Sequence, residues 1–183
     1  MIYKCSELKN KLGSFAKINS AVKRGEYFKI SYGLYSDRNP YASEPENIIA
    51  RYPNAIFTLQ SAFSYYDMSD YVPDKYYLAT FQGAHKIQNK KVKQIYITDK
   101  LLNIGKTTIK TDSGIINIYD KERLLIELFR LKNKLSFDYF KEVVNSYRKL
   151  FEEDQIDTYK LAVYCAQFNN GDNILRQIQE VAL

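Results

Sequence analysis

Residues 6–36, SELKNKLGSFAKINSAVKRGEYFKISYGLYS, decide the fold of the N-terminal part of the chain. Apolar residues recur every three or four positions through the first two thirds of this stretch, which is the spacing of one helix face. Ser6 and Ser14 stand where N-caps are expected, and Gly13 stands where the first helix should end. The pattern therefore predicts a helix, a tight turn and a second helix that ends near Gly25.

The end of the same stretch predicts a β-hairpin. Residues 26–30 and 34–36 are rich in aromatic and β-branched side chains, and Gly33 between them supplies the positive φ of a tight turn. Two helices and a hairpin form the later part of a winged helix-turn-helix, whose second helix enters the major groove while the hairpin, or wing, lies along the DNA backbone. The polar side chains expected on the second helix are Lys17, Asn19, Ser20, Lys23 and Arg24, and those on the wing are Lys29 and Tyr32.

The net charge of +6 is concentrated at the N-terminus. Residues 1–38 hold eight basic and three acidic side chains, whereas the remaining 145 residues hold 19 basic and 18 acidic ones. A cationic module thus precedes a near-neutral body, and its charge favours a polyanionic partner. The predicted domains are a winged-helix module over residues 1–38 and a body over residues 39–183, with the turn-rich residues 37–45 as a linker.

The body is predicted to contain strands followed by helices, so the expected fold class is α+β. A capping box of Ser43 and Glu46 predicts a helix through Tyr52. Strands are predicted over residues 55–58, 76–80, 94–98, 107–111 and 115–119. Helices are predicted over residues 61–66, 120–133, 136–150, 157–168 and 172–182, with N-caps at Asp120, Ser136, Asp157 and Asp172.

The sequence shows no signature of catalysis or of metal binding. Cys5 and Cys165 lack a CxxC or a His at ligand spacing. The sequence has no Gly-x-Ser-x-Gly nucleophile elbow with which the single His85 could form a catalytic triad. Gly105-Lys106-Thr107 lacks the preceding glycine of a P-loop, and Pro73-Asp74 lacks the later acid and lysine of a nuclease motif. We therefore expect a non-enzymatic protein without a cofactor or a metal.

The sequence also shows no signature of a membrane or secreted protein. No apolar run approaches the length of a membrane span, and the N-terminus lacks the apolar stretch of a signal peptide. We expect a cytoplasmic protein with no membrane partner.

Three segments, in this order, resemble the AbiEi-type antitoxins, which are transcriptional regulators of type IV toxin–antitoxin systems in abortive infection. They are residues 7–37, ELKNKLGSFAKINSAVKRGEYFKISYGLYSD, residues 48–68, IIARYPNAIFTLQSAFSYYDM, and residues 116–130, INIYDKERLLIELFR. The resemblance implies binding of double-stranded operator DNA, repression of the chain's own operon and a body that counteracts a nucleotidyltransferase-like toxin. It adds Ser14 to the DNA-contacting residues named above, and it implies monomers in solution with two copies meeting on DNA.

One departure from the winged-helix pattern leaves other functions open. A complete winged helix usually has one more helix, and only five residues precede Ser6, so we expect a truncated unit. The apolar side of residues 6–22 would then need cover from the body or from a second copy of the chain. The alternatives are a protein-interaction domain with a degenerate winged helix that no longer binds DNA, and a nucleic-acid-processing enzyme with unrecognised carboxylates.

Overall fold

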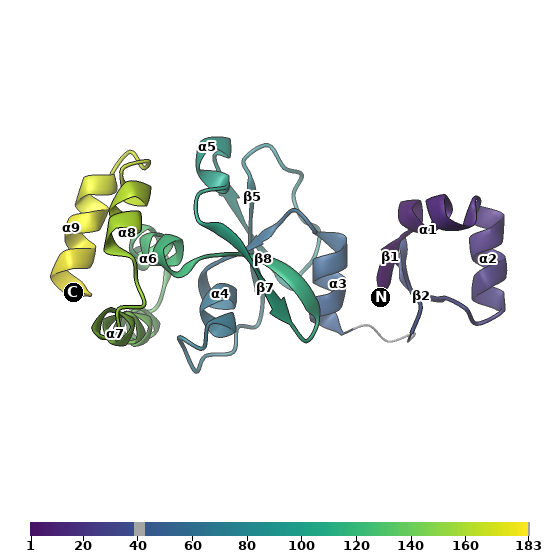
Figure 1. Ribbon diagram of the computed structural model, residues 1–183, viewed down its shortest axis with the longest axis horizontal. Helices are drawn as coiled ribbons and strands as arrows, with labels where there is room; N and C mark the ends of the chain where they lie inside the picture. The colour runs from purple at the N-terminus through teal and green to yellow at the C-terminus, as the bar shows by residue number, and fades with distance from the viewer. Residues whose placement is uncertain (39–42, 183) are drawn as a thin grey trace. The chain divides into compact units, whose positions relative to one another are not determined.

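The computed structural model describes residues 1–38 and 43–182, and the chain divides into two compact units (Figure 1). Unit 1 consists of Met1–Pro53 and Lys110–Ile116, and unit 2 consists of Asn54–Ile109 and Asn117–Leu183. Both contain helices and strands, which confirms the predicted α+β class.

Unit 1 combines three helices with a small antiparallel sheet. Its elements in chain order are β1 (Ile2–Lys4), α1 (Cys5–Leu12), α2 (Phe15–Lys23), β2 (Phe28–Ser31), β3 (Leu34–Ser36) and α3 (Glu44–Arg51). The strand order is β1-β3-β2, so β3 is central, and Tyr35 lies opposite Tyr3 on one side and Lys29 on the other. The sheet thus joins the N-terminus of the chain to the hairpin that follows the two helices.

The turns of unit 1 follow the predicted positions, with one difference. Ser14 accepts a hydrogen bond from the Lys17 N–H and caps α2, and Gly33 has a φ of +74° in the turn between β2 and β3. The first helix begins at Cys5, before the predicted cap Ser6. A carboxylate of Glu7 accepts the Lys4 N–H at 2.7 Å, and this bond closes the helix start instead of a serine hydroxyl.

The apolar side of the two helices is covered within unit 1. Leu8 and Ile18 are buried in one cluster with Ala21, Tyr27 and Tyr35. The expectation that this side depends on the body or on a second copy is therefore wrong for these residues, because the aromatic rings of the sheet region already cover them.

A third helix reaches unit 1 from beyond the hairpin. The helix α3 packs against β1, and its Arg51 donates a hydrogen bond to the Ser31 hydroxyl at 2.8 Å. Ser43 and Glu46 form the predicted capping box at its start. The chain divides after Pro53 and not after residue 38 as predicted, because α3 belongs to unit 1. Residues 39–42 of the predicted linker lie outside the described residues.

Unit 2 is built on a mixed sheet in the order β6-β5-β4-β8-β7. The strands are β4 (Ile56–Phe57), β5 (Tyr76–Phe81), β6 (Val92–Ile97), β7 (Lys106–Thr111) and β8 (Gly114–Tyr119), and the outer ends of β7 and β8 are grouped with unit 1. The central β4 pairs antiparallel with β5 and parallel with β8, and β5 pairs parallel with β6 at the edge. All five strands lie within one residue or two of their predicted positions.

The helices of unit 2 are α4 (Leu59–Tyr65), α5 (Asp99–Leu102), α6 (Lys121–Arg130), α7 (Phe137–Glu152), α8 (Thr158–Cys165) and α9 (Gly171–Val181), with a short 3-10 turn at Lys132–Lys134. The helices α4, α8 and α9 pack against α6, whose residues 122–129 are all buried. Asp120, Ser136 and Asp157 are the N-caps, as predicted. The predicted cap Asp172 is wrong, because the N-cap of α9 is Asn170, two residues earlier. Across residues 1–38 and 43–182, no helix combines the length and apolarity needed to cross a membrane.

Candidate nucleic-acid interface

The outer face of α2 is polar and exposed. Ile18 and Ala21 are buried on its inner side, and the helical period then directs Asn19, Ser20 and Lys23 to the outside. Lys17 is also exposed, on the flank of this face. Lysine and asparagine side chains can contact phosphates and base edges, so this face has the chemistry of a recognition helix.

Two of the predicted contact residues already make bonds within α2. The half-buried Ser14 uses its hydroxyl oxygen as the N-cap, at 3.3 Å from the Lys17 nitrogen. The Ser20 hydroxyl donates to the Ala16 carbonyl oxygen at 3.0 Å. Ser14 therefore positions the helix, and the Ser20 oxygen stays able only to accept from a donor on DNA.

Arg24 forms an ion pair on the surface of unit 1. Its Nε and Nη2 atoms donate to the two Glu26 carboxylate oxygens at 2.6 and 3.1 Å. The hydrogen bond from Arg24 lowers the pKa of the Glu26 carboxyl and raises that of the guanidinium. A DNA phosphate would have to compete with Glu26 for Arg24.

Glu26→Gln is expected to strengthen DNA binding by about twofold to fivefold, the range of one exposed ion pair. The change removes the competing carboxylate and one negative charge from the α2 surface. Fluorescence anisotropy with a labelled duplex measures the affinity, and Glu152→Gln on α7 is the control with the same change of charge. Equal or weaker binding by Glu26→Gln would show that Arg24 does not face DNA.

The wing presents Lys29 and Tyr32 to solvent. Tyr32 lies in the turn between β2 and β3 and is 91% exposed, and Lys29 is exposed on β2. A large aromatic side chain that projects from a two-residue turn makes no contact that the fold needs. These two side chains are therefore available to a backbone that runs along the hairpin.

The three acidic residues of residues 1–38 are all held by local partners. Glu7 closes the start of α1, and Glu26 holds Arg24. Asp37 binds the N-terminal ammonium group and the Tyr3 hydroxyl, and the bond to the ammonium group lowers the pKa of its carboxyl. Lys17, Lys23 and Lys29 form no ion pair in the described part of the chain.

The sequence pattern missed a cationic contact at the start of α2. The Lys9 ammonium group lies 5.4 Å from the centroid of the Phe15 ring, and Phe15 is exposed. On the other side of α1, Lys11 lies 5.0 Å from the Tyr3 ring and 5.6 Å from the Tyr27 ring. The sequence signal for the Lys9–Phe15 contact was the spacing of these residues on either side of Gly13, but the contact can be recognised only when the geometry of the turn is known.

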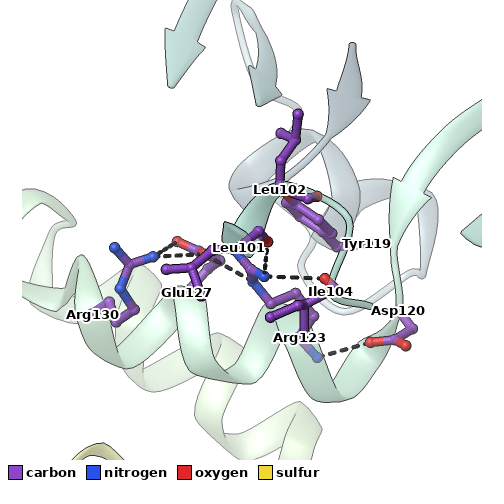
Figure 2. Close-up of polar contacts among 8 residues, drawn as sticks. All are labelled: Leu101, Leu102, Ile104, Tyr119, Asp120, Arg123, Glu127 and Arg130. Atoms are coloured by element: carbon purple, nitrogen blue, oxygen red, sulfur yellow. Dashed lines mark hydrogen bonds and ion pairs between the residues drawn. The ribbon is translucent and has the colours of Figure 1, made fainter. Parts of the chain in front are cut away.

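A fully buried charge, Arg123, lies in unit 2 and has a structural role (Figure 2). The Arg123 side chain has 0% exposure, and its guanidinium donates to Glu127 at 2.7 and 3.0 Å and to the carbonyl oxygens of Leu101 and Ile104 at 2.6 and 3.1 Å. Arg130 contributes two further bonds to Glu127, at 2.7 and 2.9 Å. Four hydrogen bonds from this guanidinium go to groups of the protein, so Arg123 fixes the α5 turn on α6.

Gly105→Ala is expected to destabilise unit 2 by about 2–4 kcal/mol. Gly105 has a φ of +71°, and an added Cβ would lie 2.4 Å from the Arg123 Cβ and 2.8 Å from an Asp120 carboxylate oxygen. Gly25→Ala is the matched control, because Gly25 has a φ of +75° with open space around it and incurs the backbone strain alone. Urea unfolding followed by circular dichroism measures the unfolding free energy of both variants. Equal losses of stability would show that the residues around Arg123 can move to accommodate the added Cβ.

A second charged cluster joins α6 to α8. Lys160 donates to Asp120 and Glu122 at 3.0 and 2.9 Å, and Tyr164 donates to Asp120 at 3.1 Å. Burial acts to lower the pKa of Lys160, but its bonds to the two carboxylates outweigh this effect and raise it. Burial, with these carboxylates, raises the pKa of Tyr66 to about 12. Neither group titrates near neutral pH, where a general acid or base would have to act.

Metal-ligating side chains are dispersed. Over residues 1–38 and 43–182, no three His, Cys, Asp or Glu residues lie close enough together to hold a metal ion. The structure thus places the predicted α2 and wing residues in the same unit, and it places the buried carboxylates of unit 2 in ion pairs. No protein-family model matches the chain, and comparison with curated proteins finds no match either.

Proposed function

We propose that the chain is a non-catalytic DNA-binding protein whose unit 1 acts as a winged helix, with α2 in the major groove and the turn between β2 and β3 along the backbone. The observation that carries the proposal is the outer face of α2, which presents Lys17, Asn19 and Lys23 and is followed directly by an antiparallel hairpin; neither lysine forms an ion pair within residues 1–38 and 43–182. Helix pair and hairpin follow one another in the order of a winged helix-turn-helix. The helix α3 supplies a third helix from the C-terminal side of the wing.

The proposal extends to a transcriptional autorepressor and antitoxin that counteracts a nucleotidyltransferase-like toxin. This part rests on the resemblance of the three quoted segments to AbiEi-type antitoxins. Burial of Leu8 and Ile18 within unit 1 supports a monomer in solution, because these apolar side chains need no second copy to cover them. Two copies would then meet on adjacent half-sites of operator DNA.

Binding to the duplex upstream of the chain's own gene is the test of this function. We expect log K to fall with log salt with a slope of at least about 3 in magnitude, since each neutralised phosphate contributes about 0.9. Anisotropy titrations at several salt concentrations measure the slope, and a scrambled duplex of equal length measures the sequence preference. A flat salt response, or no binding, would contradict the proposal.

A protein-interaction role is the second candidate, and one observation favours it. Phe15 and Tyr32 are exposed aromatic residues of unit 1, at the start of α2 and in the hairpin turn, and Arg24 is already paired with Glu26. Exposed aromatic side chains are enriched at protein interfaces. A chain that ignores duplex DNA but binds the product of a neighbouring gene, with loss on Phe15→Ala, would support this role.

A further inference from the structure

Unit 2 carries a segment of 24 residues without an acidic side chain. Between Asp74 and Asp99 the chain has Lys75, Lys86, Lys90, Lys91 and Lys93, together with His85. The rest of residues 39–183 then holds 14 basic and 18 acidic side chains, so the near-neutral total of the body hides a separation of charge. None of the five lysines forms an ion pair in the described part of the chain, and all five are exposed.

The fold places this segment along one edge of the unit 2 sheet. It comprises β5, the edge strand β6 and the loop of residues 82–91 that connects them. The Gln94 side chain holds the loop against β6, by accepting from the Ile87 N–H at 2.8 Å and donating to the His85 carbonyl oxygen at 3.1 Å. The Tyr76 N–H bonds the Lys91 carbonyl oxygen at 2.7 Å where the loop ends. Lys75, Lys90, Lys91 and Lys93 therefore lie where β5 and β6 begin, and Lys86 lies in the loop that Gln94 holds.

A groove of about 970 Å³ opens where β5 and β6 end, next to α5 and the start of α9. Two aromatic side chains on its wall, Phe81 and Tyr96, are each 46% exposed. The wall also carries six side-chain amides, from Gln82, Asn133, Gln167, Asn169, Asn170 and Gln177. Its cationic side chains are Lys100, Arg130 and Lys132, and among the described residues that line it Asp99 has the only carboxylate.

We infer that this edge and groove form a second nucleic-acid site, which binds a single-stranded polynucleotide. The half-exposed rings offer faces on which bases can stack, the amides can bond base edges, and the lysines near the start of β5 and β6 can bind phosphates of a strand that continues along the sheet edge. Lysines alone could have another role, because charged side chains on an edge strand such as β6 prevent it from pairing with a strand of another chain. That explanation does not account for the acid-free loop or for two exposed rings at a concave, amide-lined surface.

An acidic protein segment is the competing occupant, and the groove favours it less. Carboxylates would satisfy the lysines, but they would leave the aromatic faces and the amide groups of the groove without matched partners. A single-stranded nucleic acid supplies all three: charge, flat rings and hydrogen-bonding edges. The inference goes beyond the proposed function, because it concerns unit 2 and a different form of nucleic acid.

The test uses the full chain and two labelled single strands, an oligouridylate and an oligothymidylate, in anisotropy titrations at low salt. Binding of either strand supports the inference, and a preference between them identifies RNA or DNA. Phe81→Ala with Tyr96→Ala is expected to weaken binding by about tenfold or more. Phe137→Ala with Tyr159→Ala removes two exposed aromatic rings from α7 and α8 and is the matched control, expected to bind as the wild type does.

A charge test complements the ring test. Lys86→Glu with Lys93→Glu should weaken binding at least tenfold and flatten its salt dependence, whereas Lys141→Glu with Lys149→Glu on α7 should have a small effect. Circular dichroism confirms the fold of each variant, and Phe81→Tyr with Tyr96→Phe, which keeps both rings, should bind normally. Unchanged binding by the ring variant, or equal competition by polyglutamate, would overturn the inference.

Variants of unit 1 separate this site from the proposed operator function. Lys23→Glu with Arg24→Glu should lose duplex binding and keep single-strand binding. Loss of both would place the single strand on unit 1 and overturn the inference, while failure of duplex binding alone would contradict the proposed function and leave the unit 2 site supported.

Discussion

Arg123→Met is expected to lower the free energy of unfolding of unit 2 by about 3–5 kcal/mol, the cost of breaking a buried ion pair by removing one partner. The guanidinium has 0% exposure and bonds Glu127 and two backbone carbonyl oxygens, so its loss leaves the two carbonyl oxygens without this donor and leaves Glu127 with bonds from Arg130. It also lies 4.5 and 4.8 Å from the ring centroids of Tyr119 and Phe168, and these contacts disappear with it. Urea unfolding measured by circular dichroism gives the difference.

Two further variants distinguish the ion pair from simple loss of packing. Arg130→Met should cost less than half as much, because Arg130 is partly exposed and Glu127 keeps its bonds to Arg123. Arg123→Met combined with Glu127→Met should be less destabilising than the sum of its single changes, since an apolar pair leaves no buried charge unpaired. A cost below about 1 kcal/mol for Arg123→Met would show that the group does not hold the α5 turn.

Lys23→Glu with Arg24→Glu is expected to weaken binding to the upstream duplex by at least about a hundredfold while the chain keeps its fold. The double change reverses two charges on the exposed end of α2, next to the phosphates that a recognition helix approaches. Each lost phosphate contact also lowers the salt slope by about one. Anisotropy titrations with wild-type and variant protein measure both effects.

Lys141→Glu with Lys149→Glu is the control, because it makes the same change of net charge on α7 of unit 2. This control variant should bind the duplex within about threefold of the wild type, since neither lysine belongs to α2 or to the wing. An equal loss in both double variants would mean that net charge alone, and not α2, attracts DNA.

The elements of unit 1 were largely predictable because their signals are local. Ser14, Gly13 and Gly33 act within one turn of their own position, so caps and turns can be recognised from neighbouring residues. The strand β1 was not predictable, since three residues give no alternation and Ile2–Lys4 is fixed by pairing with β3, whose partner residues lie at least 30 positions later. The docking of α3 on β1 depends on the same long-range packing.

The buried network of unit 2 could not be predicted from its spacing. Arg123 and Glu127 are four residues apart, which normally indicates an exposed pair on a helix surface. Only the packing of α4, α8 and α9 around α6 removes this pair from water. The five lysines of residues 75–98, in contrast, are visible in the sequence. A charge count over the whole body does not reveal them, because acidic residues elsewhere in the body balance their charge.

The measurement that tests the central claim most directly is nuclear magnetic resonance mapping of the backbone amides as the upstream duplex is added. The account predicts that the largest chemical-shift changes fall on α2 and on the turn between β2 and β3, within residues 14–33, with small changes over α7. Changes that centre on unit 2, or amides of α2 that do not respond to saturating duplex, would contradict it.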